Sequence, residues 1–329
     1  MVFIFFQSLI VTFSFFLIFL ALNKRFAWLK SFNFRWGGMV LIISFIFLFF
    51  LHPELEITKQ FQALLIGLLA ILVFGLKDDY SNLSWVVQFI FQLFLVVLLV
   101  VFGFRIDFIT GIFGEVISLN FFSWHGVSLG SFVFLFFWVL GIMNAVNWFD
   151  GIDSSLGSVA IFAGLGLLFV SLLPEVNQPA IAIVSSIFLG NITAFMFFNL
   201  PPAKLIAGTS GSYFVGFFLA VLAVIAGNKI ATLLIVLALP LLDLLAVVIV
   251  RLKNRQSIFQ RDENHLHHLL LKSGWSEYQV FFLYSVFLGV VLFTFFLLQD
   301  RFWKVLLLFG EILFLSLMLV FIRFFKLSK

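Results

Sequence analysis

The sequence predicts an all-α protein that crosses a membrane about eleven times, and three observations lead to this prediction. The chain is 64% hydrophobic and only 10% charged, and its mean hydropathy is +1.23, which lies outside the range of soluble globular domains. Its apolar runs recur at the length that spans a lipid bilayer. Its basic residues fall in the polar segments between those runs. The 329 residues are therefore expected to form a single integral membrane domain, residues 1–329.

Composition also excludes several classes of function. The chain contains no cysteine, which excludes disulfides, thiolate metal sites and cysteine nucleophiles. A pI near 9.4 would suggest nucleic-acid binding in a soluble protein. Because the basic residues lie in short loops between apolar runs, we expect them to set membrane topology instead, with no nucleic acid as a partner.

Eleven apolar runs, each bounded by polar or turn-forming residues, are the predicted spans. They lie at about 2–22, 37–51, 61–76, 85–102, 131–147, 156–173, 180–198, 213–227, 230–250, 280–298 and 305–322. The segment near 104–122 alternates apolar and polar residues and contains turn residues, which predicts a small β-hairpin on the outer surface. The first span lacks a basic region before it and a cleavage site after it, so it is expected to be an uncleaved anchor.

The distribution of basic residues predicts which side of the membrane each loop faces. Lys24 and Arg25 directly follow the first span, which places the N-terminus outside. With that start, most of the 19 lysines and arginines fall on the inner side, and the C-terminus is cytoplasmic. The inner loops are then 24–36, 77–84, 144–155, 199–212 and 251–278. Since every unusual polar motif falls in one of these loops, we expect them to form one composite site at the cytoplasmic face.

Four acidic residues stand at the inner ends of predicted spans. Asp78 and Asp79 are adjacent, and Asp150 and Asp153 lie three apart in the motif NAVNWFDGID. Carboxylates at the membrane edge are costly unless they meet water or a cation, so they indicate a functional site. Acids that converge there suit Mg²⁺, which prefers oxygen ligands and bridges phosphates. Taken alone, Asp78 and Asp79 would equally fit a solvated helix end.

Two further motifs supply groups that can bind phosphates. The turn GTSGS at 208–212 opens the eighth span, so its backbone N–H groups and the helix dipole form an anion cradle. Lys204 lies just ahead of it, as a phosphate ligand or as a snorkelling side chain. His265, His267 and His268 follow; on a helix His265 and His268 share a face while His267 points away. Zinc is the weaker interpretation of these histidines, since the chain has no cysteine.

Four motifs taken together carry a resemblance to a known family. In chain order they are KDDYSNLS, NAVNWFDGID, FNLPPAKLIAGTSGS and NHLHHLLLKSG. The chain resembles the polyprenyl-phosphate N-acetylhexosamine-1-phosphate transferases, which start bacterial cell-envelope glycans such as lipopolysaccharide or teichoic acid. The resemblance extends from FRWGG at 34–38 to about residue 280 and includes PLLD at 240–243.

The resemblance implies a reaction, a cofactor and a location. A sugar-1-phosphate passes from a UDP-N-acetylhexosamine to undecaprenyl phosphate, and UMP is released. The form HLHH resembles the branch that transfers GlcNAc-1-phosphate. The cofactor is Mg²⁺ or Mn²⁺, the partners include membrane lipid, and the protein is a multi-pass protein of the bacterial inner membrane with a cytoplasmic active site. The UDP-sugar, the envelope polymer and the formation of a homodimer stay open.

The resemblance also implies roles for individual residues. Asp78 and Asp79 lie near the lipid phosphate, one of them as a base or orienting group. Asp150 joins them as a catalytic residue, and the metal site combines these three with the position of Thr209. The catalytic histidines His265, His267 and His268 are implied at the diphosphate-sugar, and Asn199 near the uridine. The residues implied around the nucleotide and diphosphate are Asn144, Asn147, Asp153, Lys204, Ser210, Gly211, Ser212 and Arg261.

One position departs from the family pattern. The family turn reads GDxGS and its aspartate is a principal metal ligand, whereas this chain has Thr209, and a neutral hydroxyl is a poorer ligand for Mg²⁺. Asn82 and Gln88 also stand where many relatives carry a basic residue. Three interpretations compete: a metal held more weakly by Asp78, Asp79 and Asp150; a catalytically impaired relative that acts as a scaffold; or a deliberately altered position. A transporter of lipid-linked sugars is a rival of another class, but it predicts internal repeats and charged segments at the membrane centre.

Overall fold

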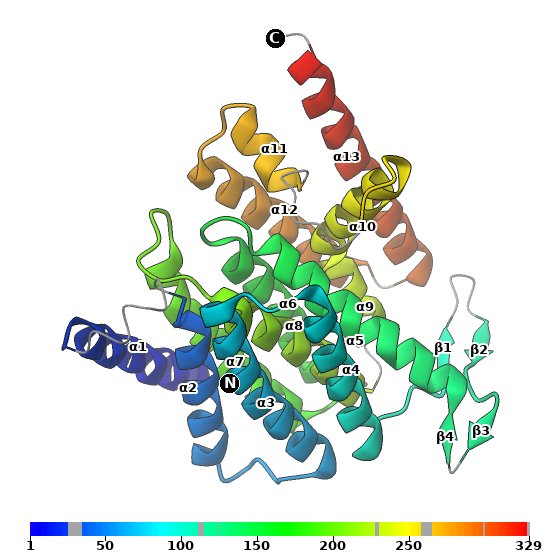
Figure 1. Ribbon diagram of the computed structural model, residues 1–329. Helices are drawn as coiled ribbons and strands as arrows, with labels where there is room; N and C mark the ends of the chain where they lie inside the picture. Colours follow the sequence, from blue (N-terminus) through cyan, green and yellow to red (C-terminus); the bar gives the residue numbers. More distant parts are fainter. Residues whose placement is uncertain are drawn as a thin grey trace.

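The computed structural model describes residues 1–25, 35–110, 115–124, 126–227, 230–257, 265–298 and 300–327. In these ranges the chain is mainly helical, with four short strands (Figure 1). The helices are α1 (Val2–Arg25), α2 (Gly37–Leu51), α3 (Lys59–Ser81), α4 (Trp85–Val101), α5 (Leu129–Phe149), α6 (Ser155–Leu172), α7 (Pro179–Asn199), α8 (Gly208–Ile225), α9 (Ile230–Val236), α10 (Ala238–Lys253), α11 (Leu266–Lys272), α12 (Glu277–Leu297) and α13 (Arg301–Leu327).

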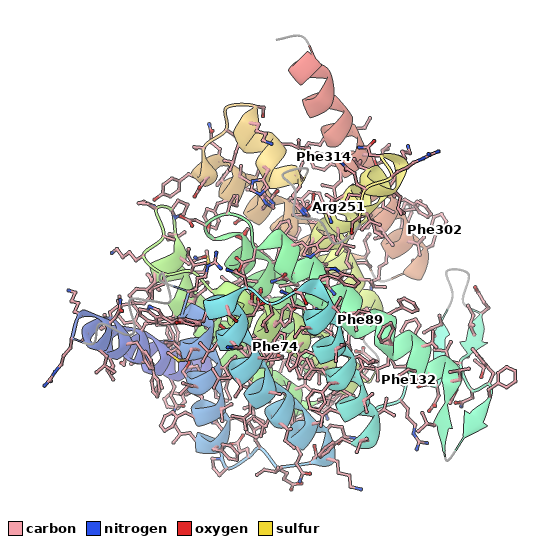
Figure 2. All side chains as sticks on the ribbon, in the orientation of Figure 1. Phe74, Phe89, Phe132, Arg251, Phe302 and Phe314 are labelled. Carbon is pink, nitrogen blue, oxygen red and sulfur yellow. The ribbon has the colours of Figure 1, made fainter. Side chains whose placement is uncertain are left out.

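Many of the helices have the length and composition of membrane spans, so the protein is a multi-pass membrane protein. Within the described residues, seven helices meet both criteria, namely α1, α3, α5, α6, α7, α8 and α12, and α2 and α4 are shorter apolar helices. The count of eleven spans stays a prediction. Large apolar side chains are exposed around the periphery, where Figure 2 labels Phe89, Phe302 and Phe314. This is the pattern expected where lipid is the solvent.

One predicted span differs from the structure. The run at about 230–250 is not one helix but two, α9 and α10, which are separated at Leu237. The physical reason is Pro240, which has no backbone N–H to donate and is tolerated only in the first turn of a helix. Pro240 lies in the first turn of α10, so a new helix begins just before it.

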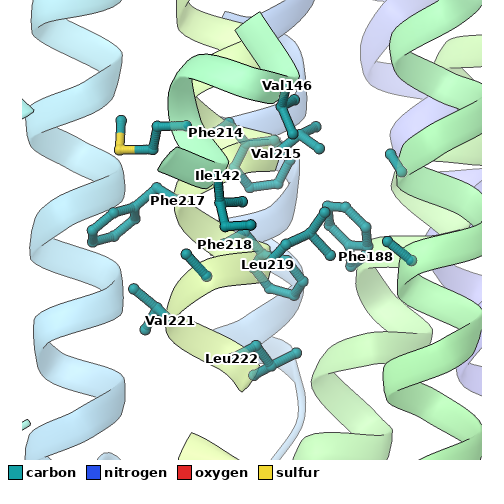
Figure 3. Close-up of a cluster of buried hydrophobic side chains, with 14 of the residues drawn as sticks. Ile142, Val146, Phe188, Phe214, Val215, Phe217, Phe218, Leu219, Val221 and Leu222 are labelled. Carbon is teal, nitrogen blue, oxygen red and sulfur yellow. The ribbon is translucent and has the colours of Figure 1, made fainter. Parts of the chain in front are cut away.

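Helix α8 is the centre of the bundle. Its residues from Ser210 to Val224 are buried, as expected for a helix that is apolar on all faces. Figure 3 shows Phe214, Phe217 and Phe218 among side chains from neighbouring helices. A Cβ added at Gly216 would lie 2.7 Å from the Cα of Met143 in α5, so the two backbones touch. Helices on several sides therefore fix the position of the N-terminus of α8.

The region of the predicted β-hairpin contains two antiparallel strand pairs. Strand β1 (Phe108–Thr110) pairs with β2 (Val116–Ser118), and β3 (Ser123–Trp124) pairs with β4 (Val127–Ser128). Both pairs lie at the start of α5, on the right in Figure 1. The first pair falls inside the segment near 104–122, and the second extends the β structure beyond it.

A buried asparagine connects three helices on the other side of the bundle. Oδ1 of Asn191 in α7 accepts hydrogen bonds from Thr12 of α1 and from Ser44 of α2 (3.3 Å). Its Nδ2 donates to the backbone oxygen of Leu41 at 3.0 Å. A Cβ added at Gly190 would lie 2.5 Å from the backbone oxygen of Phe5. Small and polar residues therefore bring α1 close to α7, as is common in membranes.

Replacing Asn191 by Leu is expected to lower the free energy of unfolding by about 1–2 kcal/mol, because hydrogen bonds between membrane helices have energies of this order. Unfolding in detergent micelles measures the loss. Ser14→Ala is the control, since the exposed Ser14 hydroxyl donates to Ile10 within its own helix. Equal losses in the two variants would contradict a role for Asn191 in joining the helices.

Candidate functional site at the N-terminus of α8

Segments that are far apart in the sequence meet around the N-terminus of α8. The backbone N–H of Gly37 donates to Ile206 at 3.1 Å, and that of Gly38 donates to Ala207 at 3.0 Å. The hydroxyl of Tyr278 donates to the backbone oxygen of Pro201. Contacts of Asp79 with Thr209 and of Asp153 with Ala203 bring in the segments 77–84 and 144–155. The ends of several helices and the turns that follow them thus form one polar region.

Asp79 caps α8. Its Oδ1 accepts from the backbone N–H of Thr209 at 2.7 Å. Its Oδ2 accepts from the backbone N–H of Ser210 at 3.2 Å and from the Ser210 hydroxyl at 3.0 Å. Gly208 has φ of +69°, and a Cβ there would lie 2.6 Å from the carboxylate. The sequence predicts a substrate anion at this helix terminus; in the structure the anion is Asp79.

Asp78 is satisfied by a different set of donors. Its Oδ1 accepts from the backbone N–H of Leu83 at 2.8 Å and from Gln88 at 3.1 Å. Its Oδ2 accepts from the hydroxyl of Thr209 at 2.6 Å. Thr209, the residue that departs from the family pattern, is therefore a hydrogen-bond donor to the aspartate pair. A carboxylate at the same position would instead add a third negative charge beside it.

Asn144 belongs to a buried amide network. Its Nδ2 donates to Oε1 of Gln92 at 2.9 Å, and Gln92 donates to the hydroxyl of Tyr213 at 2.9 Å. Tyr213 in turn lies 3.5 Å from Gln88, the partner of Asp78. Sequence reasoning did not select Gln92 or Tyr213. The sequence does contain a signal for Gln92, because a glutamine in the middle of an apolar span requires a polar partner.

The loop after α5 is held by backbone and side-chain hydrogen bonds. Asp153 accepts from the backbone N–H of Ala203 at 2.7 Å. Asn199 accepts from the backbone N–H of Ser154 at 2.9 Å and donates to Leu205 at 2.9 Å. Both residues, which the sequence assigns to the substrate, therefore join the loop 150–155 to the turn 200–207.

The remaining residues of the turn GTSGS are packed inside the bundle. Ser210, Gly211 and Ser212 are buried. Asn147 donates to the hydroxyl of Ser212 at 2.7 Å. A Cβ added at Gly38 would lie 2.0 Å from the backbone nitrogen of Gly211, so α2 and α8 are in backbone contact. These three residues determine how closely the helices approach.

Two predicted substrate-binding residues are not part of these contacts. Lys204 is exposed to solvent on the turn before α8. Arg261 lies outside the described residues. The position of Lys204 leaves its ammonium group free to meet either a substrate phosphate or the lipid surface, the two roles that the sequence allows.

Asp150 is a carboxylate of the site whose surroundings disfavour its charge. It is partly buried at the end of α5. Burial, with smaller contributions from the charges of Asp79 and Asp153 and against the opposing effect of Arg35, raises its pKa from the ordinary value of 3.8 to about 7. The ionised form is therefore destabilised by its surroundings, and a cation placed beside it would relieve this effect.

The three histidines occupy different environments. His265 precedes α11 as its N-cap, and His268 is partly exposed. His267 is fully buried, and a Cβ added at Gly151 would lie 2.1 Å from its Nε2. Burial, with smaller contributions from His268 and His265, lowers its pKa to about 3. The helical spacing suggested that His267 points away; instead the neutral ring of His267 packs against the loop 150–155, because α11 begins after His265.

The donor groups fit a divalent cation that arrives with a phosphate ligand. Among the described residues, no three histidine, aspartate or glutamate side chains are arranged as metal ligands. Every oxygen of Asp78 and Asp79 already accepts a hydrogen bond. Mg²⁺ is commonly held by one or two carboxylates together with water and substrate phosphates. Asp150, with its raised pKa, suits the part of such a protein ligand.

Fold and site together define a helical membrane protein with a polar, carboxylate-rich site at the ends of its helices. Residues 61–227 match the sequence model of the family described as glycosyl transferase family 4. The chain belongs to this family.

Three relatives that the chain resembles in sequence are named as transferases. The chain is 28% identical over 266 residues to the probable undecaprenyl-phosphate N-acetylglucosaminyl 1-phosphate transferase of Bacillus subtilis, covering 77% of this chain and 71% of the relative. It is 29% identical over 231 residues to the undecaprenyl-phosphate alpha-N-acetylglucosaminyl 1-phosphate transferase of Yersinia pestis, covering 66% and 60%. It is 28% identical over 182 residues to the phospho-N-acetylmuramoyl-pentapeptide-transferase of Leuconostoc mesenteroides, covering 54% and 55%.

Replacing Gly151 by Ala is expected to destabilise the protein by about 1–3 kcal/mol, the usual cost of overpacking, because the new Cβ would collide with the buried ring of His267. Thermal unfolding and hydrogen exchange along α11 measure the effect. Gly141→Ala is the control, since nothing lies within 4 Å of a Cβ added there. Unchanged exchange in α11 of Gly151→Ala would contradict the contact.

Replacing Asp150 by Asn is expected to raise the melting temperature at pH 8, with a smaller effect as the pH falls toward 4. The native carboxyl has a raised pKa, so the cost of ionising it is absent below its unfolded pKa of 3.8, grows as the pH rises from there to about 7, and is complete above that pH. Melting curves of both proteins across this range test the prediction. The exposed Asp300, replaced by Asn, is the control, and a difference independent of pH would be the contrary result.

Proposed function

We propose that this protein transfers a sugar-1-phosphate, GlcNAc-1-phosphate in the first instance, from a UDP-sugar to undecaprenyl phosphate and releases UMP. Membership of the family and the names of the relatives in Bacillus subtilis and Yersinia pestis support the reaction. The observation that carries the proposal is the meeting of Asp78, Asp79 and Asp150 with the N-terminus of α8, at the ends of apolar helices. A substrate with a lipid tail and a charged head requires such a boundary.

The reaction is a displacement at phosphorus. An oxygen of undecaprenyl phosphate forms a bond to the β-phosphorus of the UDP-sugar, and the bond from that phosphorus to the bridging oxygen breaks. UMP leaves with the electron pair of this bond, and the sugar stays on the lipid through a diphosphate. Such transfers are accelerated mainly by positioning and by stabilisation of charge.

The residues of the site would divide these tasks. Asp78 or Asp79 orients the lipid phosphate or accepts its proton. Asn147, Asp153, Asn199 and Lys204 would surround the nucleotide and diphosphate, and His265 and His268 would face the diphosphate-sugar. Arg261, which lies outside the described residues, is proposed for the same role as Lys204 on the resemblance alone. The hydrogen bonds of Asp78 and Asp79 within the chain hold their carboxylates in fixed orientations, so little reorganisation is needed when the substrates bind.

We propose Mg²⁺ or Mn²⁺ as the cofactor, with Asp150 as its protein ligand beside Asp78 and Asp79. When bound, the ion would offset negative charge on the phosphates. Thr209 supplies a donor to Asp78 and not a carboxylate, which favours weak binding of the ion in the absence of nucleotide. The site would face the cytoplasm of a bacterial cell, as the positive-inside rule predicts.

Thr209 also favours a second candidate function, that of a catalytically impaired relative that acts as a scaffold. In this case the fold and the polar contacts remain, and the chain binds its partners without turnover. The two candidates differ in whether the native sequence releases UMP.

Purified protein supplied with UDP-GlcNAc, undecaprenyl phosphate and Mg²⁺ is expected to release UMP. Asp78→Asn is expected to lower the rate at least about 100-fold, the scale of a lost acid–base or orienting group, while the similar shape of the amide preserves the fold. Glu56→Gln is the matched control, because Glu56 is exposed beyond the opposite end of α3.

Thr209→Asp, assayed in parallel, separates the two candidate functions. Turnover by the native chain, lost in Asp78→Asn, supports the transferase. Turnover only in Thr209→Asp identifies an impaired relative. Absence of UMP from every variant, with other UDP-sugars also tried, would overturn the proposed reaction in favour of the scaffold.

A further inference from the structure

A buried carboxylate lies behind the first histidine of the site. Asp243 of α10 is only 5% exposed. Its Oδ2 lies 2.7 Å from Nδ1 of His265, and its Oδ1 accepts from the backbone N–H of Leu266 at 2.7 Å. The two oxygens therefore contact two consecutive residues, His265 and Leu266, at the point where α11 begins. Paired in this way, a buried carboxylate avoids the cost of an uncompensated charge.

The pairing determines which nitrogen of His265 carries the hydrogen. An ionised carboxylate can only accept hydrogen bonds, so Nδ1 of His265 must donate. The other nitrogen, Nε2, then remains as the group that can meet a ligand. A carboxylate in this position fixes both the tautomer and the orientation of an imidazole ring.

The other neighbours of His265 connect it to the site. The ring of Trp148, two residues before Asp150, packs edge-on against it with centroids 5.9 Å apart. Arg251 of α10, labelled in Figure 2, lies over the ring of Trp148, with its guanidinium carbon 4.9 Å from the ring centroid. The ring of His267 is parallel to that of His265 at 5.6 Å. His265 thus lies between Asp243 of α10, Trp148 of α5 and His267 of α11.

We infer that Asp243 is a positioning residue, which holds His265 as the Nδ1–H tautomer, so that Nε2 presents a lone pair that can accept a hydrogen bond from a hydroxyl or amide N–H group of the substrate's sugar. The inference rests on the proposed function for the identity of that substrate. Asp243 contacts His265 and the start of α11, so it acts through the histidine and not on the reacting atoms. It joins α10, whose PLLD segment at 240–243 is part of the family resemblance, to the transfer reaction.

Asp243→Asn tests this role with little change in shape. The amide oxygen can still accept from Leu266, but its NH₂ group would donate to Nδ1 of His265 and so favour the opposite tautomer. We expect kcat to fall by up to about 10⁴-fold, the loss known for an aspartate-to-asparagine change behind a catalytic histidine. The KM for the UDP-sugar and the melting temperature are expected to change little.

A double-mutant cycle distinguishes positioning from a general structural effect. If Asp243 acts through His265, Asp243→Asn adds no further loss of kcat in a His265→Gln background. A loss of the same size in both backgrounds, or full activity of Asp243→Asn, would overturn the inference.

A spectroscopic measurement keeps the inference separate from the proposed reaction. In ¹⁵N-histidine NMR spectra at pH 8, with His265→Gln used for assignment, the native ring is expected to carry hydrogen on Nδ1, and Asp243→Asn is expected to move it to Nε2. A native Nε2–H tautomer would overturn the inference even if UMP is released. The expected tautomers without any UMP release would leave the pairing established and refute the proposed function.

Discussion

The contact between Asp79 and the first N–H groups of α8 is the interaction on which the site depends. A helix that is buried on all sides leaves its first N–H groups without partners in the helix itself. A carboxylate at the end of α3 likewise requires partners at the edge of a membrane. Each satisfies the other, with N–H to oxygen distances of 2.7 and 3.2 Å. The helix dipole adds to the attraction, since its positive end faces the charge.

Close packing by small residues makes this contact possible. A Cβ added at Gly75 would lie 2.4 Å from the Cα of Ser210, and one added at Gly38 would lie 2.0 Å from the nitrogen of Gly211. Glycine thus lets α2 and α3 reach the backbone of α8, as small residues do between membrane helices. The same packing sets the level at which α3 ends, so the polar segments that follow the helices lie side by side. Close packing by glycines therefore determines both how these helices pack and how the site is arranged.

Hydropathy predicted most helices at nearly their observed bounds, because an apolar run and its polar ends are properties of the sequence alone. The partners of polar side chains could not be found in this way. Spacing gives the face of a helix on which a residue lies, but not the neighbouring segment. Asp79 occupies the helix terminus that the sequence assigned to a substrate anion, and His265 is the extended N-cap of α11 and not part of a helix with His267 and His268. Pro240 indicated the break between α9 and α10. Only the structure shows that this proline, and not the continuous apolar run, determines where the helix ends.

The hydrogen bonds divide the acids of the site into two kinds. Asp78 and Asp79 accept bonds from Leu83, Gln88, Thr209 and Ser210, so their carboxylates are held in place by fixed dipoles before any substrate arrives. Burial raises the pKa of Asp150, and the like charges of Asp79 and Asp153 raise it further. Fixed dipoles orient a reacting group without reorganisation, whereas an unbalanced carboxylate attracts a mobile cation. Thr209 maintains this division, because its hydroxyl gives Asp78 a neutral donor at the point where a carboxylate would add a third negative charge.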